Sequence, residues 1–378
     1  MATPSPLFSQ PSAQVSLDSP RIVSAQEHQR SGRRALPSFG LRFPTRWRPA
    51  PLQNPHADAV ERETLRWLAA HGIGVDADER EKLRQFNCAM YGGYSLPTSD
   101  YEETLLVTQF ISLWLFWDDM QVEEHQDWDI DEVVRALDGE AGSSSRYVAA
   151  WADIGRRLQA KRSRRWLRHL ACTMRQWLEN AKFETGLAKA NQRGVCPDFQ
   201  VLFECRTISI GMFPTFHLIE HAEGFELPDA FHQHETTIAI KRLASRLVGL
   251  GNDLGGLAKD LENRWLNLVL ALTDGSGLPL AAAFQRVVDI HNADVAEMDR
   301  AAARLPSFGA AVDALAQRWV QAVRYNVHGF TLWEATAERY QARKVHIGDT
   351  ALVAPVVYVV DPRRGEVSLV PYDRRQVA

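Results

Sequence analysis

The chain has 378 residues, 45% of them hydrophobic and 24% charged, so it can bury one large core or two modest ones. Its formal net charge of -4 lacks the basic surplus of nucleic-acid-binding proteins, and nucleic acid is therefore not an expected partner. The four cysteines are scattered and form no CxxC pair, so a disulfide framework is not expected. No apolar run approaches the roughly 20 residues of a membrane span, and the N-terminus lacks the apolar core of a signal peptide. The sequence therefore predicts a cytoplasmic protein.

Residues 1–55 are rich in Ser, Pro and Arg and show no sustained hydrophobic period, so we interpret them as an extension that does not fold alone. From residue 56 onward the pattern is helical. The segment "ADAVERETLRWLAAHGIG" has apolar residues at steps of three and four and ends at Gly72. Further helices are predicted at about residues 79–90, 101–124, 146–186, 198–221, 229–272, 279–304 and 306–342.

Residues 56–345 contain no internal repeat or long linker and are predicted to form one all-α domain. Residues 346–378 differ in character. There, "ALVAPVVYVVDPRRGEVSLVPY" has two β-branched runs on either side of "DPRRG", which predicts a short C-terminal β-hairpin.

The stretch "LWLFWDDMQVEEH" at 113–125 sets Asp118 and Asp119 directly against apolar aromatic residues. On a helix Asp119 and Glu123 are i,i+4 neighbours, so several like charges gather over little more than one turn. A divalent cation would relieve their repulsion, and oxygen ligands suit Mg²⁺ or Mn²⁺. The alternative is that a buried helix reaches water here and its acids are solvated.

A second polar face occurs in "GLGNDLGGLAKDLENRW". Asn252, Gly256 and Asp260 are spaced i, i+4 and i+8 and share one helix face, with Lys259 beside them. They form either a second wall of a metal-diphosphate site or a polar surface stripe.

Two further groups have side chains suited to phosphate oxygens. Arg339 and Tyr340 lie near the end of the last helical segment, preceded by Trp333. Arg206 lies in an otherwise apolar helix that Gly211 and Pro214 are expected to break or kink, as at many functional sites.

Taken together, these motifs make the chain resemble the class I terpene synthases of the bacterial and fungal single-domain type, over roughly residues 43–345. Asp118, Asp119 and Glu123 match the aspartate-rich motif in its DDxxxE form. The helix face of Asn252, Gly256 and Asp260 matches the NDxx(S/T)xxxE triad, with Lys259 in its usual place. Arg339 and Tyr340 match the C-terminal RY pair, and Arg206 matches the diphosphate-sensing arginine.

The resemblance implies a helical bundle around a central active-site cavity and a Mg²⁺-dependent terpene cyclase. It implies three Mg²⁺ ions, replaceable by Mn²⁺, at the two acidic walls. The substrate would be a linear isoprenyl diphosphate, most commonly farnesyl diphosphate; geranyl or geranylgeranyl diphosphate are alternatives. The residues implied to grip the diphosphate are Arg206, Lys259, Arg339 and Tyr340.

Two departures from the family pattern lie in the second motif. Gly256 replaces a metal-binding hydroxyl, and Asp260 is one methylene shorter than the usual Glu. We expect metal binding to be retained with lower affinity, because glycine leaves room for a water in place of the hydroxyl.

Aromatic faces stabilise carbocations without reacting with them, so we expect an aromatic cavity wall. The candidates are Phe110, Trp114, Phe213 and Trp333. The family pattern further implies that Ser209 and Ile210 link Arg206 to ionisation through a local carbonyl, next to Gly211. Each aromatic residue also has a core-packing interpretation.

Three rival functions are weaker. A prenyl chain-elongating synthase usually carries two DDxxD motifs, and a helical HD phosphohydrolase needs an adjacent His-Asp pair that the chain lacks. The third alternative is a helical scaffold without catalysis, in which Gly256 and Asp260 would be marks of lost function. The expected assembly is a monomer or homodimer.

Overall fold

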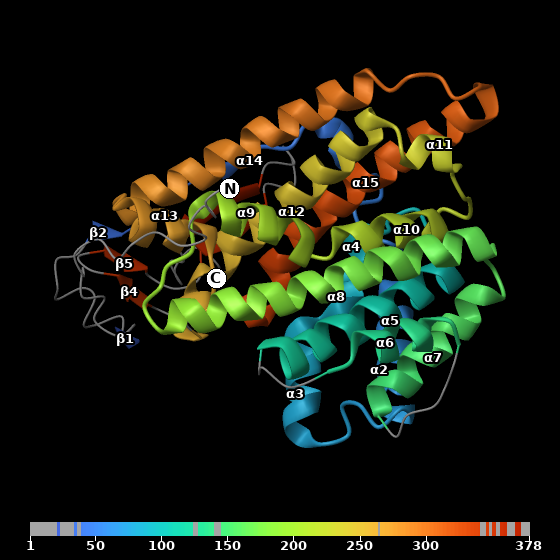
Figure 1. The fold of residues 1–378 in the computed structure, drawn as a ribbon, viewed down its shortest axis with the longest axis horizontal. Helices are drawn as coiled ribbons and strands as arrows, with labels where there is room; N and C mark the ends of the chain where they lie inside the picture. The colour runs from blue at the N-terminus through green and yellow to red at the C-terminus, as the bar shows by residue number, and fades with distance from the viewer. Residues whose placement is uncertain are drawn as a thin grey trace, which may run out of the picture.

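A computed structural model of the protein describes residues 21–22, 34–35, 39–123, 128–139, 145–263, 265–340, 345–347, 350–352, 356–360 and 367–371. Within these residues the chain is a bundle of α-helices with two small sheets (Figure 1). The sheet strands β1, β2, β4 and β5 lie at one end of the bundle, beyond α13 (Figure 1). The expected all-α class is confirmed.

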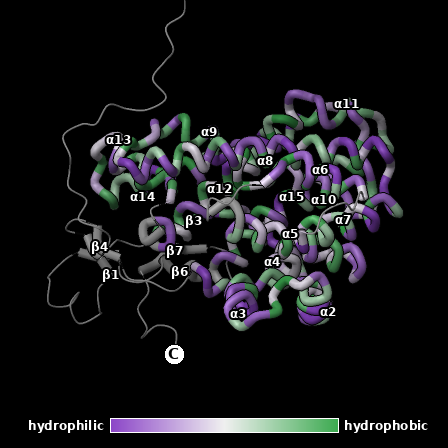
Figure 2. Tube along the Cα trace, turned by 60° about the horizontal axis from the view of Figure 1, so that its bottom comes forward, coloured by the Kyte–Doolittle hydropathy of each residue, from purple (hydrophilic) through white to green (hydrophobic). Residues whose placement is uncertain are grey.

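Most helices show hydrophilic and hydrophobic residues mixed along their length, as expected for amphipathic helices that bury one face (Figure 2). In the described part of the chain, no helix combines the length and the apolar character needed to cross a membrane. The helices are α2 (Ala57–Ala70), α3 (Ala77–Phe86), α4 (Cys88–Ser95), α5 (Tyr101–Trp117), α6 (Ile130–Leu137), α7 (Arg146–Gln159), α8 (Arg164–Gln192), α9 (Phe199–Ser209), α10 (Met212–Ala222), α11 (Asp229–His232), α12 (Glu235–Asn263), α13 (Leu268–Ser276), α14 (Leu280–Ala303) and α15 (Ala310–Thr336).

Several predicted helices are divided where a local signal ends them. Asn87 adopts a left-handed conformation (φ 49°) and separates α3 from α4. The predicted helix 146–186 is two helices, because the Ser163 hydroxyl accepts a hydrogen bond from Trp166 N and starts α8. Asn267 caps α13 in the same way through Val269 N. Helix α6, a short helix that Asp129 caps, was not predicted from the sequence.

The folded body begins before residue 56. The chain forms strand β3 (Phe39–Leu41) and the 3-10 turn η1 (Thr45–Trp47), and three of its apolar side chains, Leu41, Phe43 and Trp47, are buried. The indole nitrogen of Trp47 donates to Asp299 Oδ1 at 3.0 Å, which ties η1 to α14. Phe39, Leu41 and Phe43 alternate with other residues, but this period-two pattern spans only five residues and was not recognised as a strand.

The predicted C-terminal hairpin is confirmed. Strand β6 (Val356–Val360) pairs antiparallel with β7 (Val367–Pro371), with Val356 opposite Pro371; the intervening "DPRRG" lies outside the described residues. Strand β7 also pairs antiparallel with β3. A second sheet has the order β1 (Arg21–Ile22), β4 (Val345–Ile347), β5 (Thr350–Leu352) and β2 (Arg34–Ala35). Segments from the two ends of the chain therefore share both sheets.

The core includes histidines that carry no charge. The Phe43 ring meets the rings of His291 and His328 edge-on, each with ring centroids 5.3 Å apart. Burial lowers the pKa of both histidines to about 4. Since an unfolded-chain histidine has a pKa of about 6.5, only the unfolded state takes up these protons as the pH falls. The contribution of these neutral histidines to the free energy of unfolding is therefore fully present above pH 6.5, and it is lost as the pH falls toward 4.

We expect His291→Phe to weaken this acid sensitivity. Between pH 6.5 and 4, the slope of the unfolding free energy against pH should fall by up to about 1.4 kcal/mol per pH unit, the contribution of one proton. Urea unfolding at a series of pH values measures the slope. His56→Gln, at an exposed histidine, is the control for loss of a histidine at the surface. An unchanged slope in His291→Phe would contradict the assignment.

Candidate active site

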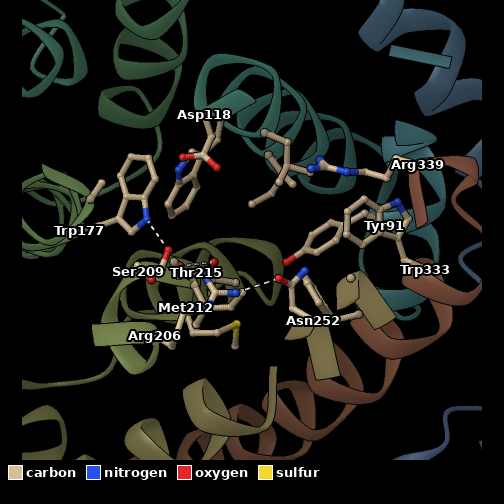
Figure 3. Close-up of a pocket in the computed structure, with 18 of the residues that line it drawn as sticks. Tyr91, Asp118, Trp177, Arg206, Ser209, Met212, Thr215, Asn252, Trp333 and Arg339 are labelled. Carbon is tan, nitrogen blue, oxygen red and sulfur yellow. Dashed lines mark hydrogen bonds between the residues drawn. The ribbon is translucent and has the colours of Figure 1, made fainter. Parts of the chain in front are cut away.

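A cavity lies between α4, α5, α8, α9, α10, α12 and α15, the helices that hold most of its lining residues (Figure 3). One part of its wall is apolar and aromatic, and another carries acids, cations and an amide. The lining residues are Tyr91, Ile111, Trp114, Leu115, Asp118, Trp177, Ala181, Glu184, Arg206, Ser209, Ile210, Gly211, Met212, Thr215, Asn252, Gly256, Lys259, Asp260, Trp265, Phe330, Trp333, Arg339 and Tyr340.

The aromatic wall is rigid because its rings pack against one another and their polar atoms are engaged. Trp114 and Trp177 meet edge-on with ring centroids 4.6 Å apart. The indole nitrogen of Trp177 donates to Ser209 O at 2.7 Å, and that of Trp333 donates to Phe86 O at 2.8 Å. These two indoles therefore present carbon surface to the cavity without spare donors.

Two of the predicted wall residues lie elsewhere. Phe110 packs on Trp151, with ring centroids 4.9 Å apart, and Phe213 packs on Phe216. Neither lines the cavity, so the prediction for these two is corrected. The physical reason is helical phase. Phe110, eight positions before Asp118, lies about 80° away from it around the helix, whereas Ile111, at seven positions, lies within about 20°. Phe213 follows the lining residue Met212 by one position, which turns it about 100° around α10.

The acidic motif begins where α5 ends, and the chain there forms a π-helix, Asp118–Glu123. Asp118 lines the cavity. Asp119 does not: its Oδ1 accepts from Arg339 at 3.0 Å, and its Oδ2 lies 3.7 Å from Lys82 Nζ. The side chain of Glu123 lies outside the described residues. A π-helix repeats i→i+5, so the expected i,i+4 alignment of Asp119 with Glu123 does not apply.

Arg206 is held in a buried network on the opposite side of the cavity from Asp118 (Figure 3). Its guanidinium donates to Asp253 Oδ1 at 2.7 Å, to Glu184 Oε1 at 2.9 Å and to Asn252 Oδ1 at 2.9 Å. Although burial opposes its charge, the carboxylates of Asp253 and Glu184 raise the pKa of Arg206 well above its ordinary value. Arg206 therefore remains a fixed cation.

Glu184 and the role of Asp253 were not predicted from the sequence. Glu184 follows the lining residues Trp177 and Ala181 at i+7 and i+3, so helical spacing would have located it once one of them was assigned. Asp253 is adjacent to Asn252 but is fully buried behind it, where its second oxygen accepts from Leu268 N at 2.8 Å. Its function here is to hold Arg206.

The second acidic wall lies on α12. Asn252 Nδ2 donates to Glu334 Oε1 at 2.8 Å and to Tyr340 Oη at 3.2 Å, while Asp260 accepts from Asn267 Nδ2 at 2.8 Å. Burial raises the pKa of Asp260 to about 7, and the charge of Lys259 opposes the rise. A divalent cation would stabilise this buried carboxylate, so the oxygen donors of this wall fit Mg²⁺.

The break between α9 and α10 is confirmed at Gly211, which has φ +83°. A Cβ there would lie 2.8 Å from the Trp114 ring, so glycine is required both by conformation and by space. Pro214 falls in the first turn of α10, where its missing N–H costs no helical hydrogen bond, and it does not itself break the helix. Ser209 and Ile210 both line the cavity at this break.

The remaining predicted cations also meet at the cavity. The guanidinium of Arg339 lies 4.5 Å from the centre of the Phe86 ring and 5.2 Å from that of Tyr340, which fixes its direction. Burial raises the pKa of Tyr340 well above its ordinary value, so its hydroxyl keeps its proton. Arg206, Lys259, Arg339 and Tyr340 thus all line one cavity.

A helical bundle with an aromatic cavity bounded by acids and cations defines an enzyme of the class I terpene synthase type. The family model described as "Terpene synthase family 2, C-terminal metal binding" matches residues 109–297, half of the chain, and the chain belongs to this family.

Characterised relatives and a solved structure agree with this assignment. The chain is 27% identical to a (+)-T-muurolol synthase of Roseiflexus castenholzii over 76% of this chain and 90% of the relative. It is 25% identical to a 10-epi-cubebol synthase of Sorangium cellulosum, over 77% and 96% of the two chains. The crystal structure of the SVS_A2 protein from ancestral sequence reconstruction superposes with a TM-score of 0.67 at 21% identity, covering 80% of this chain and 90% of that one, and shows the same fold.

Proposed function

We propose that the chain binds farnesyl diphosphate and cyclises it to a terpene hydrocarbon or alcohol in a Mg²⁺-dependent reaction. The (+)-T-muurolol synthase relative is described as farnesyl-diphosphate-cyclizing. The observation that carries the proposal is the arrangement of one cavity: Asp118 faces Arg206 and Asn252 across it, with an aromatic wall beside them (Figure 3).

The acidic residues of both walls are proposed to hold the metal. On one wall the metal ligands would be Asp118, Asp119 and Glu123 of the aspartate-rich motif, of which Asp118 lines the cavity. On the other wall they would be Asn252, Asp260 and a water at Gly256. When bound, Mg²⁺ supplies positive charge that offsets the negative charge developing on the leaving diphosphate. We further propose three ions, Mn²⁺ as a substitute, a cytoplasmic location and a monomeric or homodimeric assembly.

The cations of the chain are proposed to hold the diphosphate. Arg206, Lys259 and Arg339 offer N–H donors from separate parts of the wall, and Tyr340 offers a hydroxyl. Charge-assisted hydrogen bonds of this kind stabilise the leaving group more as its charge grows. Because Arg206 already contacts Glu184, Asn252 and Asp253, its guanidinium is held ready at the wall and little reorganisation is needed on binding.

The helix break is proposed to face the reacting carbon chain. Trp177 fixes the carbonyl of Ser209, while Ile210 N donates to Arg206 O at 3.1 Å, so the sensing arginine and the break are joined through the backbone. Trp114, Trp177, Phe330 and Trp333 would exclude water and stabilise positive charge through their ring faces.

A direct experiment is separate incubation of the protein and Mg²⁺ with the ten-, fifteen- and twenty-carbon linear diphosphates, followed by gas chromatography and mass spectrometry of volatile products. We expect cyclic fifteen-carbon products. Cyclic products from only the ten- or the twenty-carbon diphosphate would show that the substrate is that diphosphate and not farnesyl diphosphate. No product from any of the three, with folded protein, would favour a helical scaffold without catalysis.

Gly256→Ser tests the departure from the family motif. A Cβ at this position would lie 3.3 Å from Asp260 Oδ2, a flexible side-chain atom that can move by the few tenths of an ångström required. If the hydroxyl adds a ligand worth about 1 kcal/mol, the Mg²⁺ concentration for half-maximal turnover should fall about fivefold. A Mg²⁺ titration of steady-state rates measures this. Gly256→Ala is the control, because it adds the Cβ without the hydroxyl.

A further inference from the structure

A second polar cluster is buried outside the catalytic cavity. His217 and Glu220 lie on α10 and His232 lies on α11, and each offers one ligand atom within 4.8 Å of the other two. Glu220 has no exposed surface, and the exposed fractions are 4% for His217 and 8% for the His232 side chain. None of the three lines the catalytic cavity, where α10 contributes Met212 and Thr215 instead.

One potential ligand atom in the cluster lacks a hydrogen bond. Glu220 Oε2 accepts from the indole nitrogen of Trp166 at 3.0 Å, which fixes the carboxylate. Glu220 Oε1 lies 2.8 Å from His232 Nε2, whereas His217 Nδ1 has no hydrogen-bond partner among the described residues. A buried polar atom without a partner is rare in folded proteins, and binding a cation would satisfy it.

Groups from two other helices face the cluster. From α8, the ring of His169 lies 5.9 Å from that of His217 and 6.1 Å from that of His232, centroid to centroid. Its side chain is 32% exposed, so it connects the cluster to solvent. From α12, Lys241 Nζ lies 2.9 Å from His232 Nδ1, the ring nitrogen other than the one next to Glu220.

We propose that His217, Glu220 and His232 bind one divalent transition metal of the zinc type, with His169 or water in the remaining position. Two imidazoles and one carboxylate are a common ligand set for Zn²⁺, whereas the oxygen donors of the catalytic cavity suit Mg²⁺. Ligand atoms on one tetrahedral zinc lie about 3.3 Å apart, given bond lengths of about 2.0–2.1 Å. The three ligand atoms lie within 4.8 Å of one another, so binding requires the separations to change by no more than about 1.5 Å.

The two nitrogens of the His232 ring have different surroundings. Nε2 lies 2.8 Å from Glu220 Oε1, whereas Nδ1 lies 2.9 Å from Lys241 Nζ on the other side of the ring. The ring nitrogen that faces the other two ligands is therefore Nε2, and the partner on Nδ1 holds the ring in place.

Metal binding would also join two structural elements. Residues 223–228 connect α10 to the four-residue helix α11 without a helix of their own, and a shared metal would fix α11 on α10. A cation that binds only the folded state raises the midpoint of thermal unfolding in proportion to the logarithm of its concentration. This effect is independent of turnover and of the function proposed above.

Cobalt(II) is a suitable probe, because its visible absorption distinguishes tetrahedral nitrogen-containing sites from six-coordinate oxygen sites. Chelator-treated protein is titrated with Co²⁺ in excess Mg²⁺, and Zn²⁺ is then added. We expect one tetrahedral Co²⁺ per chain, displaced by Zn²⁺. His217→Gln and Glu220→Gln should weaken binding by more than about 100-fold. Trp166→Phe, which removes the indole donor to Glu220 and part of the buried ring that packs on His217, should weaken it by about 10- to 100-fold.

His328→Gln is the matched control, since it changes another buried histidine whose ring packs on Phe43, and it should bind Co²⁺ like the unsubstituted protein. Circular dichroism checks that each variant is folded. Unsubstituted protein that takes up no Co²⁺ or Zn²⁺ would overturn the proposal, as would equal binding by folded His217→Gln and Glu220→Gln. If one of the two variants does not fold, the proposal is tested by metal binding to the other variant and by the metal content of the unsubstituted protein.

Discussion

Arg206→Met is expected to lower the free energy of unfolding by about 3–5 kcal/mol and to reduce turnover by at least about 100-fold. The guanidinium is the buried cation between Glu184 and Asp253, so its removal leaves two carboxylates without their ion-pair partner. The same group is proposed to hold the departing diphosphate. Urea unfolding measures the first effect, and product formation from farnesyl diphosphate measures the second.

Two companion variants separate these effects. Arg242→Met breaks the Arg242–Glu204 pair, whose side chains are 44% and 48% exposed, and should cost less than about 1 kcal/mol without loss of turnover. Adding Asp253→Asn to Arg206→Met should restore part of the stability but none of the activity, because it removes one unpaired charge without restoring the cation. Recovery of turnover in the double variant would mean that Arg206 is only structural.

Asp118→Ala is expected to abolish turnover, with a loss of at least about 100-fold, while the free energy of unfolding changes by no more than about 1 kcal/mol. Asp118 is half-buried at the cavity wall, and its removal lessens repulsion among neighbouring acids. Steady-state rates at saturating Mg²⁺ and urea unfolding test the two parts.

Glu102→Ala is the matched control, an exposed acid in the first turn of α5, the helix that ends just before Asp118, and it should leave turnover unchanged. Asp119→Ala provides a contrast. Because Asp119 pairs with Arg339, its loss should alter diphosphate binding through the freed arginine and lower stability more than Asp118→Ala does. A collapse of folding in Asp118→Ala would show that this acid is structural.

The features that the sequence predicted correctly are those with local causes. The helical period identified most of the bundle, Gly211 marked the break beside Arg206, and the β-branched runs marked the hairpin of β6 and β7. The cavity residues on one helix face, Asn252, Gly256 and Asp260, could be grouped because a helix repeats at i+4.

The features that the sequence did not reveal depend on distant parts of the chain or on small changes in helical phase. Glu184 is one of two acids on the long helix α8, and only the approach of Arg206 from α9 distinguishes it from Glu179. Strand β3 is a short apolar segment until β7 pairs with it. Phe110 was predicted to line the cavity because a spacing of four residues was applied twice. Each step of four residues turns about 40° past a full turn of an α-helix, so two steps turn Phe110 about 80° away from Asp118.

The π-helix at Asp118–Glu123 changes how spacings in an acidic motif should be counted. A π turn accommodates one more residue than an α turn. In a π-helix, a motif with three residues between its aspartate pair and its final acid can therefore place that acid at the same angle around the helix as an α-helical motif with two intervening residues does. An insertion of one residue at this point would therefore be absorbed by the local winding of the helix.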